Sequence, residues 1–491
     1  MSTSRIDIDL SAIGNNIRAV RRVLSGELAS REHPEAQRDP ASSERPRVTK
    51  APAICAVLKQ DAYGMGAVRI AKRLAACGVD MIAVFSVDEA RSLVEAGIAA
   101  PMLVLMPVRN IDRSDPVYRH AVVGKLHLTI HDEDQLAAIT EVCGRLGAAM
   151  PLHVQIDTGL ARGGALPAVG ERIVESIARN PRLRLGGLMT HFATPCGDPE
   201  FTREQARLFR EWVEKIKPML VAGAGHRIDA STPHGLLIHA ANSCAVFRSS
   251  KYHGNLVRIG QCLYGYALEG ASDREGAEFA AAAASLQPAT RWTSSVVHIK
   301  DVPTGFPVGY GSTWRAARPT RIALVPIGYA DGYPRLLSNA AVVGFTGNAW
   351  ERSGATLPPG ADTASAGSPT GRASNPAPTM YAPVIGRVSM DQITIDVSDV
   401  PISMCKVGSE VEIAVGERAA PNSFLRLAEL SQSIVHEQMC RVGPRVERSY
   451  RLSASGTQPR IHVFPESPAS GASFGGDRGS ALACDYRADA V

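Results

Sequence analysis

Between Lys59 and Gly265, short apolar runs alternate with amphipathic runs, and this alternation limits the possible folds more than any other feature. Amphipathic runs such as Ala67–Cys77 and Asp134–Leu146 lie between most of the apolar runs. Strand–helix alternation repeated about eight times implies a parallel sheet, and this length fits a (β/α)8 barrel. We therefore expect an α/β protein with an N-terminal TIM barrel. The expected strands are Met81–Ser86, Met102–Met106, Leu126–Ile130, Leu152–Asp157, Leu185–His191 and Arg227–Ala230.

The pattern changes near Trp292, where apolar and polar residues begin to alternate as they do in half-buried strands. We expect residues 1–270 to form the barrel part, opening with a short strand and a helix capped by Ser11. Residues 285–451 are expected to form a mainly β domain. The composition of residues 25–50, 353–378 and 453–491 predicts two flexible insertions and a disordered tail. Strands of the second domain are expected at Thr320–Ile327, Val384–Val388, Gln392–Val397 and Glu410–Val415.

The chain has 491 residues, 45% hydrophobic and 21% charged, a composition typical of a globular protein with roughly two or three domains. Its 53 basic and 48 acidic side chains nearly balance, which argues against nucleic-acid binding. Neither a run of about 18 apolar residues nor a signal-peptide core is present, so we expect a cytoplasmic protein without membrane contact. Nine cysteines without a Cys-x-x-Cys pair favour reduced, buried thiols over disulfides or a metal site.

Lys59 follows a run from Ala53 to Leu58 that is expected to be a buried strand, and it precedes a turn that contains Gly64 and Gly66. Burial disfavours the charged ammonium and lowers the pKa of a lysine. A lysine of that kind is nucleophilic enough to form an imine with an aldehyde such as pyridoxal phosphate. Position alone favours an ordinary surface lysine at a strand end.

The segment Val57–Gly66 resembles the cofactor-lysine signature of the alanine racemases, a lysine and two small or polar residues followed by Ala-Tyr-Gly-His-Gly. Two positions depart from it. Gln60 stands where a small residue is usual, and Met65 stands where histidine is commoner. The resemblance extends over roughly residues 5–24, 51–270 and 290–451, with the motifs in the family's order. It implies the barrel, the β domain and pyridoxal 5'-phosphate as cofactor.

Racemisation at Cα needs a base on each face of the reacting centre. The segment 301–314 resembles the family segment that holds the second base, and Tyr310 is the matching residue. The resemblance implies that Lys59 exchanges the proton on the D side and Tyr310 on the L side. In the family this tyrosine reaches the lysine of the other subunit, which implies a homodimer with active sites at the interface. The sequence leaves open whether the contact forms within or between subunits.

Arg258 lies in the segment Val257–Gly265, which resembles the family segment whose arginine faces the pyridine nitrogen. Arginine only donates hydrogen bonds, so it keeps that nitrogen unprotonated and limits side reactions such as transamination. His239 is a candidate partner that holds the His191 ring in one tautomer. The other cofactor contacts implied by the resemblance are Tyr63, His191, Asn242, Ser243, Gly260, Gln261 and His436, of which His436 replaces a family tyrosine as phosphate donor.

The resemblance also implies residues for the substrate. Arg162 and the Met390 backbone would meet the substrate carboxylate, with Asp391 beside it and Tyr329 narrowing the entrance. Many family members carry a modified lysine where this chain has Gln155, so a neutral amide or another group must orient Arg162.

These motifs together predict a racemase that interconverts L- and D-alanine and supplies D-alanine for peptidoglycan. A serine or broad-specificity racemase of the same fold is the alternative. A pyridoxal-phosphate barrel decarboxylase is disfavoured, because such enzymes put an acidic residue where Arg258 stands. A cofactor-binding protein without catalysis is disfavoured by the second domain, which barrel-only proteins of that type lack.

Overall fold

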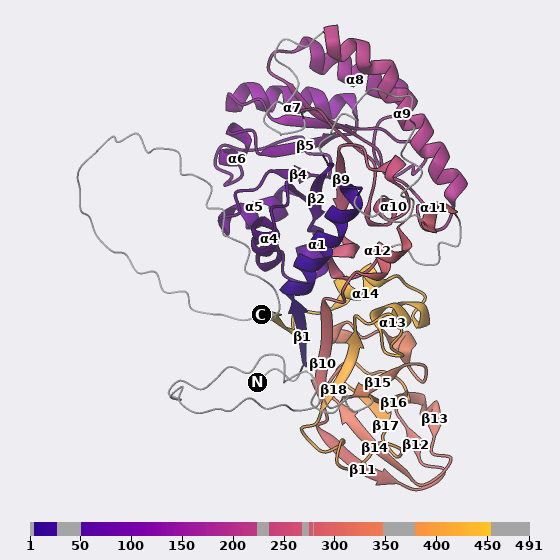
Figure 1. Cartoon of the computed structure of the whole chain (residues 1–491). Coiled ribbons are helices and arrows are strands. Elements are labelled where there is room, and N and C mark those ends of the chain that lie inside the picture. The colour runs from indigo at the N-terminus through magenta and orange to yellow at the C-terminus, as the bar shows by residue number, and fades with distance from the viewer. Residues whose placement is uncertain are drawn as a thin grey trace, which may run out of the picture. The chain divides into compact units, whose positions relative to one another are not determined.

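The computed structural model describes residues 4–26, 51–222, 235–267, 274–277, 279–346 and 379–452, all within one compact unit (Figure 1). The expected strand Arg227–Ala230, the insertion 353–378, the tail 453–491 and nearly all of the insertion 25–50 lie outside these residues.

Eight parallel strands form the barrel in the order β8-β7-β6-β5-β4-β3-β2-β9. The Asn255 amide donates to the Ile238 carbonyl at 3.0 Å and the Arg258 amide donates to the Ala241 carbonyl at 2.9 Å, which brings the two ends of the sheet together. The expected barrel is therefore confirmed. Its strands are β2 (Ala53–Val57), β3 (Met81–Val84), β4 (Met102–Val104), β5 (Leu126–Ile130), β6 (Pro151–Gln155), β7 (Arg184–Met189), β8 (Leu237–His239) and β9 (Leu256–Ile259).

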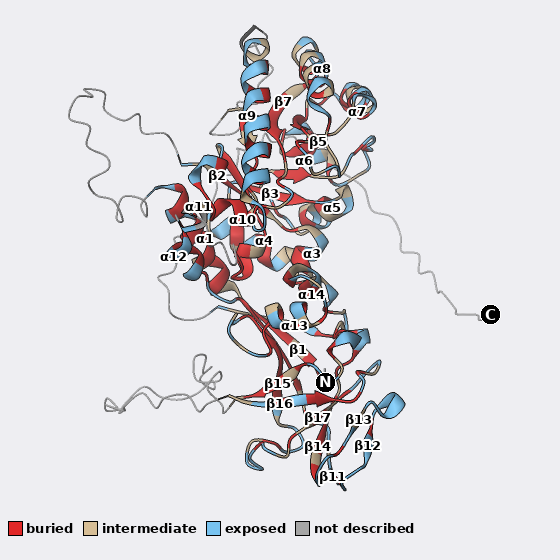
Figure 2. Ribbon diagram, turned by 90° about the vertical axis from the view of Figure 1, so that its right-hand side faces the viewer, coloured by how far each residue is buried: buried red, intermediate tan, exposed pale blue. Residues whose placement is uncertain are grey.

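Helices surround these strands, which are mostly buried, whereas the helices keep exposed outer faces (Figures 1 and 2). Every residue of β5 and β6 is buried, as expected for parallel strands covered on both faces. The helices are α1 (Leu10–Leu24), α3 (Lys59–Tyr63), α4 (Ala67–Ala76), α5 (Val87–Glu95), α6 (Tyr118–Val122), α7 (Glu133–Leu146), α8 (Pro167–Arg179), α9 (Pro199–Ala222), α10 (Ser243–Val246), α11 (Arg274–Ala277) and α12 (Ala280–Ala284). Short 3-10 turns are η1 (Ser250–Tyr252) and η2 (Gln261–Tyr264).

The second part is a nine-stranded sheet in the order β11-β14-β17-β16-β15-β18-β10-β1-β19. Its strands are β1 (Ser4–Asp9), β10 (Thr290–Ser295), β11 (His298–Val302), β14 (Thr320–Val325), β15 (Val342–Phe345), β16 (Met380–Ile385), β17 (Ile393–Asp396), β18 (Glu410–Val415) and β19 (Glu447–Arg451). A hairpin, two helices and three turns complete this β domain: β12 (Pro307–Val308), β13 (Trp314–Arg315), α13 (Phe424–Leu430), α14 (Val435–Arg441), η3 (Tyr310–Ser312), η4 (Tyr329–Asp331) and η5 (Arg335–Leu337).

Three expectations about element positions are wrong in detail. β1 pairs antiparallel with β10 and parallel with β19, so it lies in the β domain and not in the barrel part. The carboxylate of Asp9, rather than Ser11, caps α1, because its Oδ1 accepts from the amides of Ser11 and Ala12 at 2.7 and 3.0 Å. The strand expected at Val384–Val388 begins earlier and ends at Ile385, since Gly386 has a φ of +74° and turns the chain.

Candidate active site

Lys59 follows β2 at the carboxyl end of the barrel strands, and the next four residues form a left-handed turn. Gln60, Asp61, Ala62 and Tyr63 have φ values of +55°, +49°, +54° and +61°. This conformation costs an L-residue roughly 1–2 kcal/mol, so contacts must hold the turn in place. The Ala62 amide donates to the Leu58 carbonyl at 2.8 Å, and the buried Tyr264 hydroxyl donates to the Ala62 carbonyl at 2.6 Å.

Strand β19 of the β domain holds the end of the same turn. Arg448 Nε donates to the Gly64 carbonyl at 3.0 Å, and the Tyr450 hydroxyl donates to the Met65 carbonyl at 3.0 Å. A Cβ atom at Gly66 would lie 1.8 Å from the Tyr450 hydroxyl, so only glycine fits there. Met65 is fully buried, and its side chain belongs to the hydrophobic core. The departure from histidine at this position therefore adds an apolar core residue.

The surroundings of Lys59 favour its neutral amine. Burial lowers the pKa of Lys59, and the charge of Arg162 lowers it further. Cys440 and Glu89 act in the opposite direction and raise the pKa. Glu89 also anchors the turn, since its carboxylate accepts from the Gln60 amide at 2.7 Å. The structure thus brings Lys59 and Arg162 together, as the sequence predicts. The neutral Lys59 amine that this favours is suited to attack an aldehyde.

Arg258 is 3% exposed and lies between two histidine rings. Its NH1 donates to His239 Nδ1 at 2.8 Å, and its NH2 contacts His191 Nδ1 at 3.2 Å. The carbonyls of Thr190, His239 and Ala240 accept the other guanidinium hydrogen bonds. His239 therefore does not bond the His191 ring directly as expected, because Arg258 stands between them. Burial lowers the pKa of Arg258 to about 10, which leaves the guanidinium charged at neutral pH.

His191 is neutral in this setting. Burial and then the charge of Arg258 lower the pKa of His191 to about 3. Since its Nδ1 accepts from Arg258, the remaining ring proton lies on Nε2. An uncharged ring of this kind suits packing against an aromatic cofactor.

Ser243, Gly260 and Tyr63 form a cup at the first turn of α10. Ser243 Oγ accepts from the amides of Gly260 and Cys262 at 2.9 and 3.4 Å. A Cβ atom at Gly260 would lie 2.0 Å from the Tyr63 hydroxyl, so glycine makes room for that phenol. Asn242 caps α10 by accepting from the Ala245 amide at 3.1 Å. Hydroxyl and amide donors at a helix start fit a phosphate group.

Helix α14 packs over the Lys59 turn and contributes two side chains (Figure 2). The His436 ring lies 5.7 Å from the Tyr63 ring, and burial followed by the charge of Lys59 lowers the pKa of His436. Cys440 is a neighbour of Lys59 that the sequence analysis missed. Its spacing of four residues from His436 was the available signal, since residues four apart share one helix face.

Cys196 and Cys244 form a disulfide, which corrects the expectation of reduced thiols throughout. Their Cα atoms lie 6.0 Å apart, within the range that a disulfide spans. The bond joins the segment after β7 to α10, next to Ser243. Gln261 Nε2 lies 3.0 Å from the Cys244 sulfur, so Gln261 packs beside the cup. The other cysteines that the structure describes are free thiols.

Side chains of nearby residues hold the backbone of the loop that carries Arg162. Asp157 Oδ1 accepts from the amides of Gly159 and Leu160 at 2.8 and 2.9 Å. The Gln155 amide donates to the Gly163 carbonyl at 2.8 Å. The neutral amide at position 155 therefore anchors the backbone directly beside Arg162.

The remaining predicted residues form a second cluster on the β domain. Tyr310 is 73% exposed at the tip of the β12–β13 hairpin, at the end of the β domain farther from the barrel (Figures 1 and 2). The Tyr329 amide donates to the Ser389 carbonyl at 3.1 Å, which joins η4 to the loop that holds Met390. Met390 and Tyr329 are themselves exposed. Tyr310 is not among the groups that shift the pKa of Lys59.

Arg445 ties this second cluster together, and the sequence analysis missed it. It pairs with Asp331 at 3.0 Å and with Asp391 at 2.8 Å. Arg445 thereby connects η4 to the loop that holds Met390 and Asp391.

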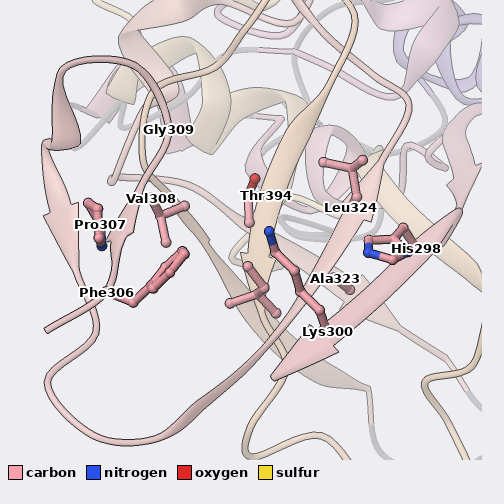
Figure 3. A pocket seen from close by; sticks show the side chains of 10 residues that line it. His298, Lys300, Phe306, Pro307, Val308, Gly309, Ala323, Leu324 and Thr394 are labelled. Atoms are coloured by element: carbon pink, nitrogen blue, oxygen red, sulfur yellow. The ribbon is translucent and has the colours of Figure 1, made fainter. Parts of the chain in front are cut away.

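A hollow of about 150 Å³ lies on the β domain beside the hairpin (Figure 3). Phe306 and Val308 line one side, and Lys300, Leu324 and His298 come from the facing sheet. The lining includes Gly309, the neighbour of Tyr310, but none of the residues expected to contact the cofactor, so the hollow is separate from the Lys59 cluster.

Comparison with known proteins agrees with this geometry. Residues 43–268 match the model of the alanine racemase N-terminal domain, and residues 289–356 and 372–450 match that of the C-terminal domain. An alanine racemase of Methylacidiphilum infernorum is 31% identical over 408 residues, covering 83% of this chain and 88% of the relative. The alanine racemase structure from Streptomyces coelicolor A3(2) superposes with a TM-score of 0.68 at 27% identity, covering 92% and 98% of the two chains. That from Bartonella henselae, with covalently bound pyridoxal phosphate, gives 0.63 at 20% identity, covering 92% and 100%. The chain belongs to the alanine racemase family.

Proposed function

We propose that this chain is a pyridoxal-phosphate-dependent alanine racemase that interconverts L- and D-alanine. Its family membership supports the reaction. The observation that carries the proposal for this chain is the Lys59 amine, whose pKa is lowered by burial and by Arg162, at the start of a left-handed turn that ends with Tyr63 at the Ser243 cup. Bound pyridoxal phosphate supplies the electron delocalisation that acidifies the Cα–H bond.

Each cofactor residue has a distinct task in this proposal. Lys59 would hold the cofactor covalently, and Arg258 would face the pyridine nitrogen as a charged, donor-only group. His191 packs against the ring, with Asn242 beside it. The residues that hold the phosphate are Tyr63, Ser243, Gly260, Gln261 and His436.

The proton at Cα moves on two faces. Lys59 Nζ takes or returns it on the D side, and the Tyr310 hydroxyl does so on the L side. Arg162 and the Met390 backbone amide hold the substrate carboxylate, with Asp391 beside them. Tyr329 narrows the entrance and excludes larger side chains.

A homodimer supplies both bases to one site in this proposal. Lys59 and Tyr310 lie in separate clusters of the chain, and the large side chains of Tyr310, Tyr329 and Met390 are all exposed. A second copy that places its Tyr310 at the barrel of the first would cover these side chains and complete the site.

The product D-alanine would serve cytoplasmic peptidoglycan synthesis. Among the residues that the structure describes, no helix combines the length and apolarity needed to cross a bilayer.

A serine or broad-specificity racemase is the second candidate. His436 replaces a phenol at the phosphate, and Gln155 anchors the Arg162 loop with a neutral amide. Both substitutions alter the surroundings of the bound amino acid.

The test is chiral analysis of the cofactor-loaded protein after separate incubation with L-alanine, L-serine and L-lysine in deuterated water. We expect D-alanine with deuterium at Cα and little product from the other two. Tyr310→Phe should abolish racemisation while the cofactor stays bound. Broad turnover would favour the second candidate, and unchanged turnover of Tyr310→Phe would refute the two-base assignment.

A further inference from the structure

Three buried imidazoles form a continuous chain that ends at Arg258. His127 Nδ1 lies 2.9 Å from His153 Nε2, and His153 Nδ1 lies 2.8 Å from His239 Nε2. His239 Nδ1 in turn lies 2.8 Å from Arg258 NH1. The exposed fractions of the three rings are 1%, 0% and 0%. The chain crosses the barrel interior from β5 through β6 to β8 and β9.

Strand β7 lies between β6 and β8, and its residues leave room for the contact between the His153 and His239 rings. A Cβ atom at Gly187 would lie 2.4 Å from His153 Nδ1. A Cβ atom at Gly186 would lie 3.2 Å from His153 Nε2. Two successive glycines therefore clear the space in which the His153 ring reaches His239. A side chain at Gly187 would enter the hydrogen bond itself.

The donor-only character of Arg258 fixes the direction of every bond in the chain. His239 Nδ1 must accept from the guanidinium, so the ring proton of His239 is on Nε2 and is donated to His153 Nδ1. His153 then carries its proton on Nε2 and donates it to His127 Nδ1. The reverse direction would leave His239 with two acceptor nitrogens, which a neutral imidazole does not have. All three rings are therefore neutral, and each is protonated at Nε2.

The three hydrogen-bonded histidine rings also explain how the buried Arg258 guanidinium stays charged. Within the part of the chain that the structure describes, the hydrogen-bond acceptors of Arg258 are imidazole nitrogens and backbone carbonyls, and none is a carboxylate. The three imidazole dipoles point their lone pairs toward Arg258, and aligned hydrogen bonds polarise one another in a buried site. Burying a charge without such acceptors is strongly unfavourable.

We propose that His127, His153 and His239 are positioning residues, whose neutral rings form a chain of hydrogen bonds that ends in an acceptor for Arg258. They stabilise its charge without an anion, so the positive potential toward the cofactor nitrogen is not cancelled. A carboxylate in their place would neutralise that potential and favour protonation of the nitrogen. The effect on the cofactor nitrogen rests on the proposed function. The protonation pattern of the three histidine rings does not depend on that function.

The first measurement is 15N NMR of the histidine-labelled holoenzyme at pH 7.5. We expect His127, His153 and His239 each to show a protonated Nε2 and an unprotonated Nδ1. An imidazolium, or a ring protonated at Nδ1, in any of the three would overturn the proposal. This readout decides the protonation pattern even if the protein fails to racemise alanine, and such a failure would count against the proposed function alone.

The second measurement compares four variants in the loaded enzyme. His153→Leu and Gly187→Ala interrupt the chain. His153→Asn keeps an acceptor oxygen toward His239. His120→Asn is the control, because it removes a half-buried histidine of α6 whose Nε2 contacts the Ile98 carbonyl at 3.1 Å. The readouts are the visible spectrum of the bound cofactor and the ratio of racemisation to pyridoxamine formation.

We expect this ratio to fall about tenfold in His153→Leu and Gly187→Ala, the size typical for loss of an outer hydrogen-bond partner. The spectrum should shift with it. His153→Asn should retain most of the ratio, and His120→Asn all of it. If His153→Leu does not fold, Gly187→Ala and His153→Asn still carry the comparison. A ratio and spectrum of the interrupted variants equal to those of His120→Asn would overturn the proposal.

Discussion

Neighbouring groups determine the pKa of the Lys59 amine. Burial and Arg162 lower its pKa, whereas Glu89 and Cys440 raise it. The neutral amine is the form that condenses with an aldehyde, so these neighbours set the pH at which the cofactor attaches. Arg162 is exposed and lies in a loop anchored by Gln155, so a residue that we propose binds the substrate also lowers the pKa of Lys59.

Arg162→Gln should move cofactor attachment to higher pH. Removing the guanidinium takes away one of the causes that lower the Lys59 pKa, so the amine becomes neutral only at higher pH. The rate at which the absorbance of bound pyridoxal phosphate develops, measured against pH, reports the midpoint. Arg109→Gln is the matched control, because Arg109 pairs with Asp132 at the surface. Equal midpoints in wild type and Arg162→Gln would contradict the assignment.

At this scale the sequence predicts candidate residues where recognisable motifs stand, as at Lys59, Ser243 and Arg258. It missed Arg445 and the link between His127 and His153. Arg445 lies 114 positions from Asp331 and 54 from Asp391, and His127 lies 26 positions from His153. Such contacts depend on which strands become neighbours in the fold. A single sequence carries no direct signal for such long-range pairs.

The left-handed turn of α3 joins local strain to the position of Lys59. The sequence predicted a turn there because of Gly64 and Gly66, but it gave no sign that four residues without glycine adopt positive φ. The backbone follows its hydrogen bonds to Tyr264, Arg448 and Tyr450, which lie far along the chain. Tertiary contacts here override local preference.

Gln60→Val should destabilise the protein relative to Gln60→Asn by ~1–2 kcal/mol, because a β-branched residue tolerates positive φ poorly and asparagine tolerates it well. Gln60 is exposed, so the difference reports the backbone rather than packing. Denaturant unfolding measures it. The same pair at the exposed helical residue Glu141 should differ by only a few tenths. A difference at Gln60 as small as that at Glu141 would show that the turn is not under strain.

The disulfide between Cys196 and Cys244 should stabilise the protein against unfolding by ~2–4 kcal/mol, since it closes a long loop. Denaturant unfolding with and without reductant should show this loss, together with weaker cofactor retention, because α10 carries Ser243. Cys196→Ser should behave like the reduced protein and should not respond to reductant. Two free thiols at these positions in the purified wild-type protein would contradict the prediction.

In the whole molecule, two clusters of candidate functional side chains lie on different parts of the fold. The barrel cluster contains Lys59 and Arg258, and the cluster on the β domain contains Tyr310 and Met390. The alternation of apolar runs was enough to predict the barrel. The place of β1 in the other sheet was not predictable, because its alternating pattern fits any half-buried strand and its partners begin at Thr290 and Glu447.

Mixing Lys59→Ala with Tyr310→Phe should restore activity that neither variant has alone. If each site takes its lysine from one subunit and its tyrosine from the other, a mixed dimer has one intact site. Random reassembly would then give about a quarter of wild-type activity. Racemisation assays after unfolding and refolding the mixture test this. Lys59→Ala mixed with the double variant should stay inactive, and an inactive first mixture would indicate that both bases come from one chain.

The contacts of β19 with the Lys59 turn link the reactive lysine to the order in which the ribosome makes the chain. Lys59 and its barrel strands are translated long before Arg448 and Tyr450, whose side chains fix the carbonyls of Gly64 and Met65. Strand β1 must likewise wait for β10 and β19 before its edges are covered. A nascent or prematurely stopped chain can therefore complete its barrel and still lack the finished shape of the lysine turn. The chain gains its cofactor site only once residues near 450 have been translated and paired.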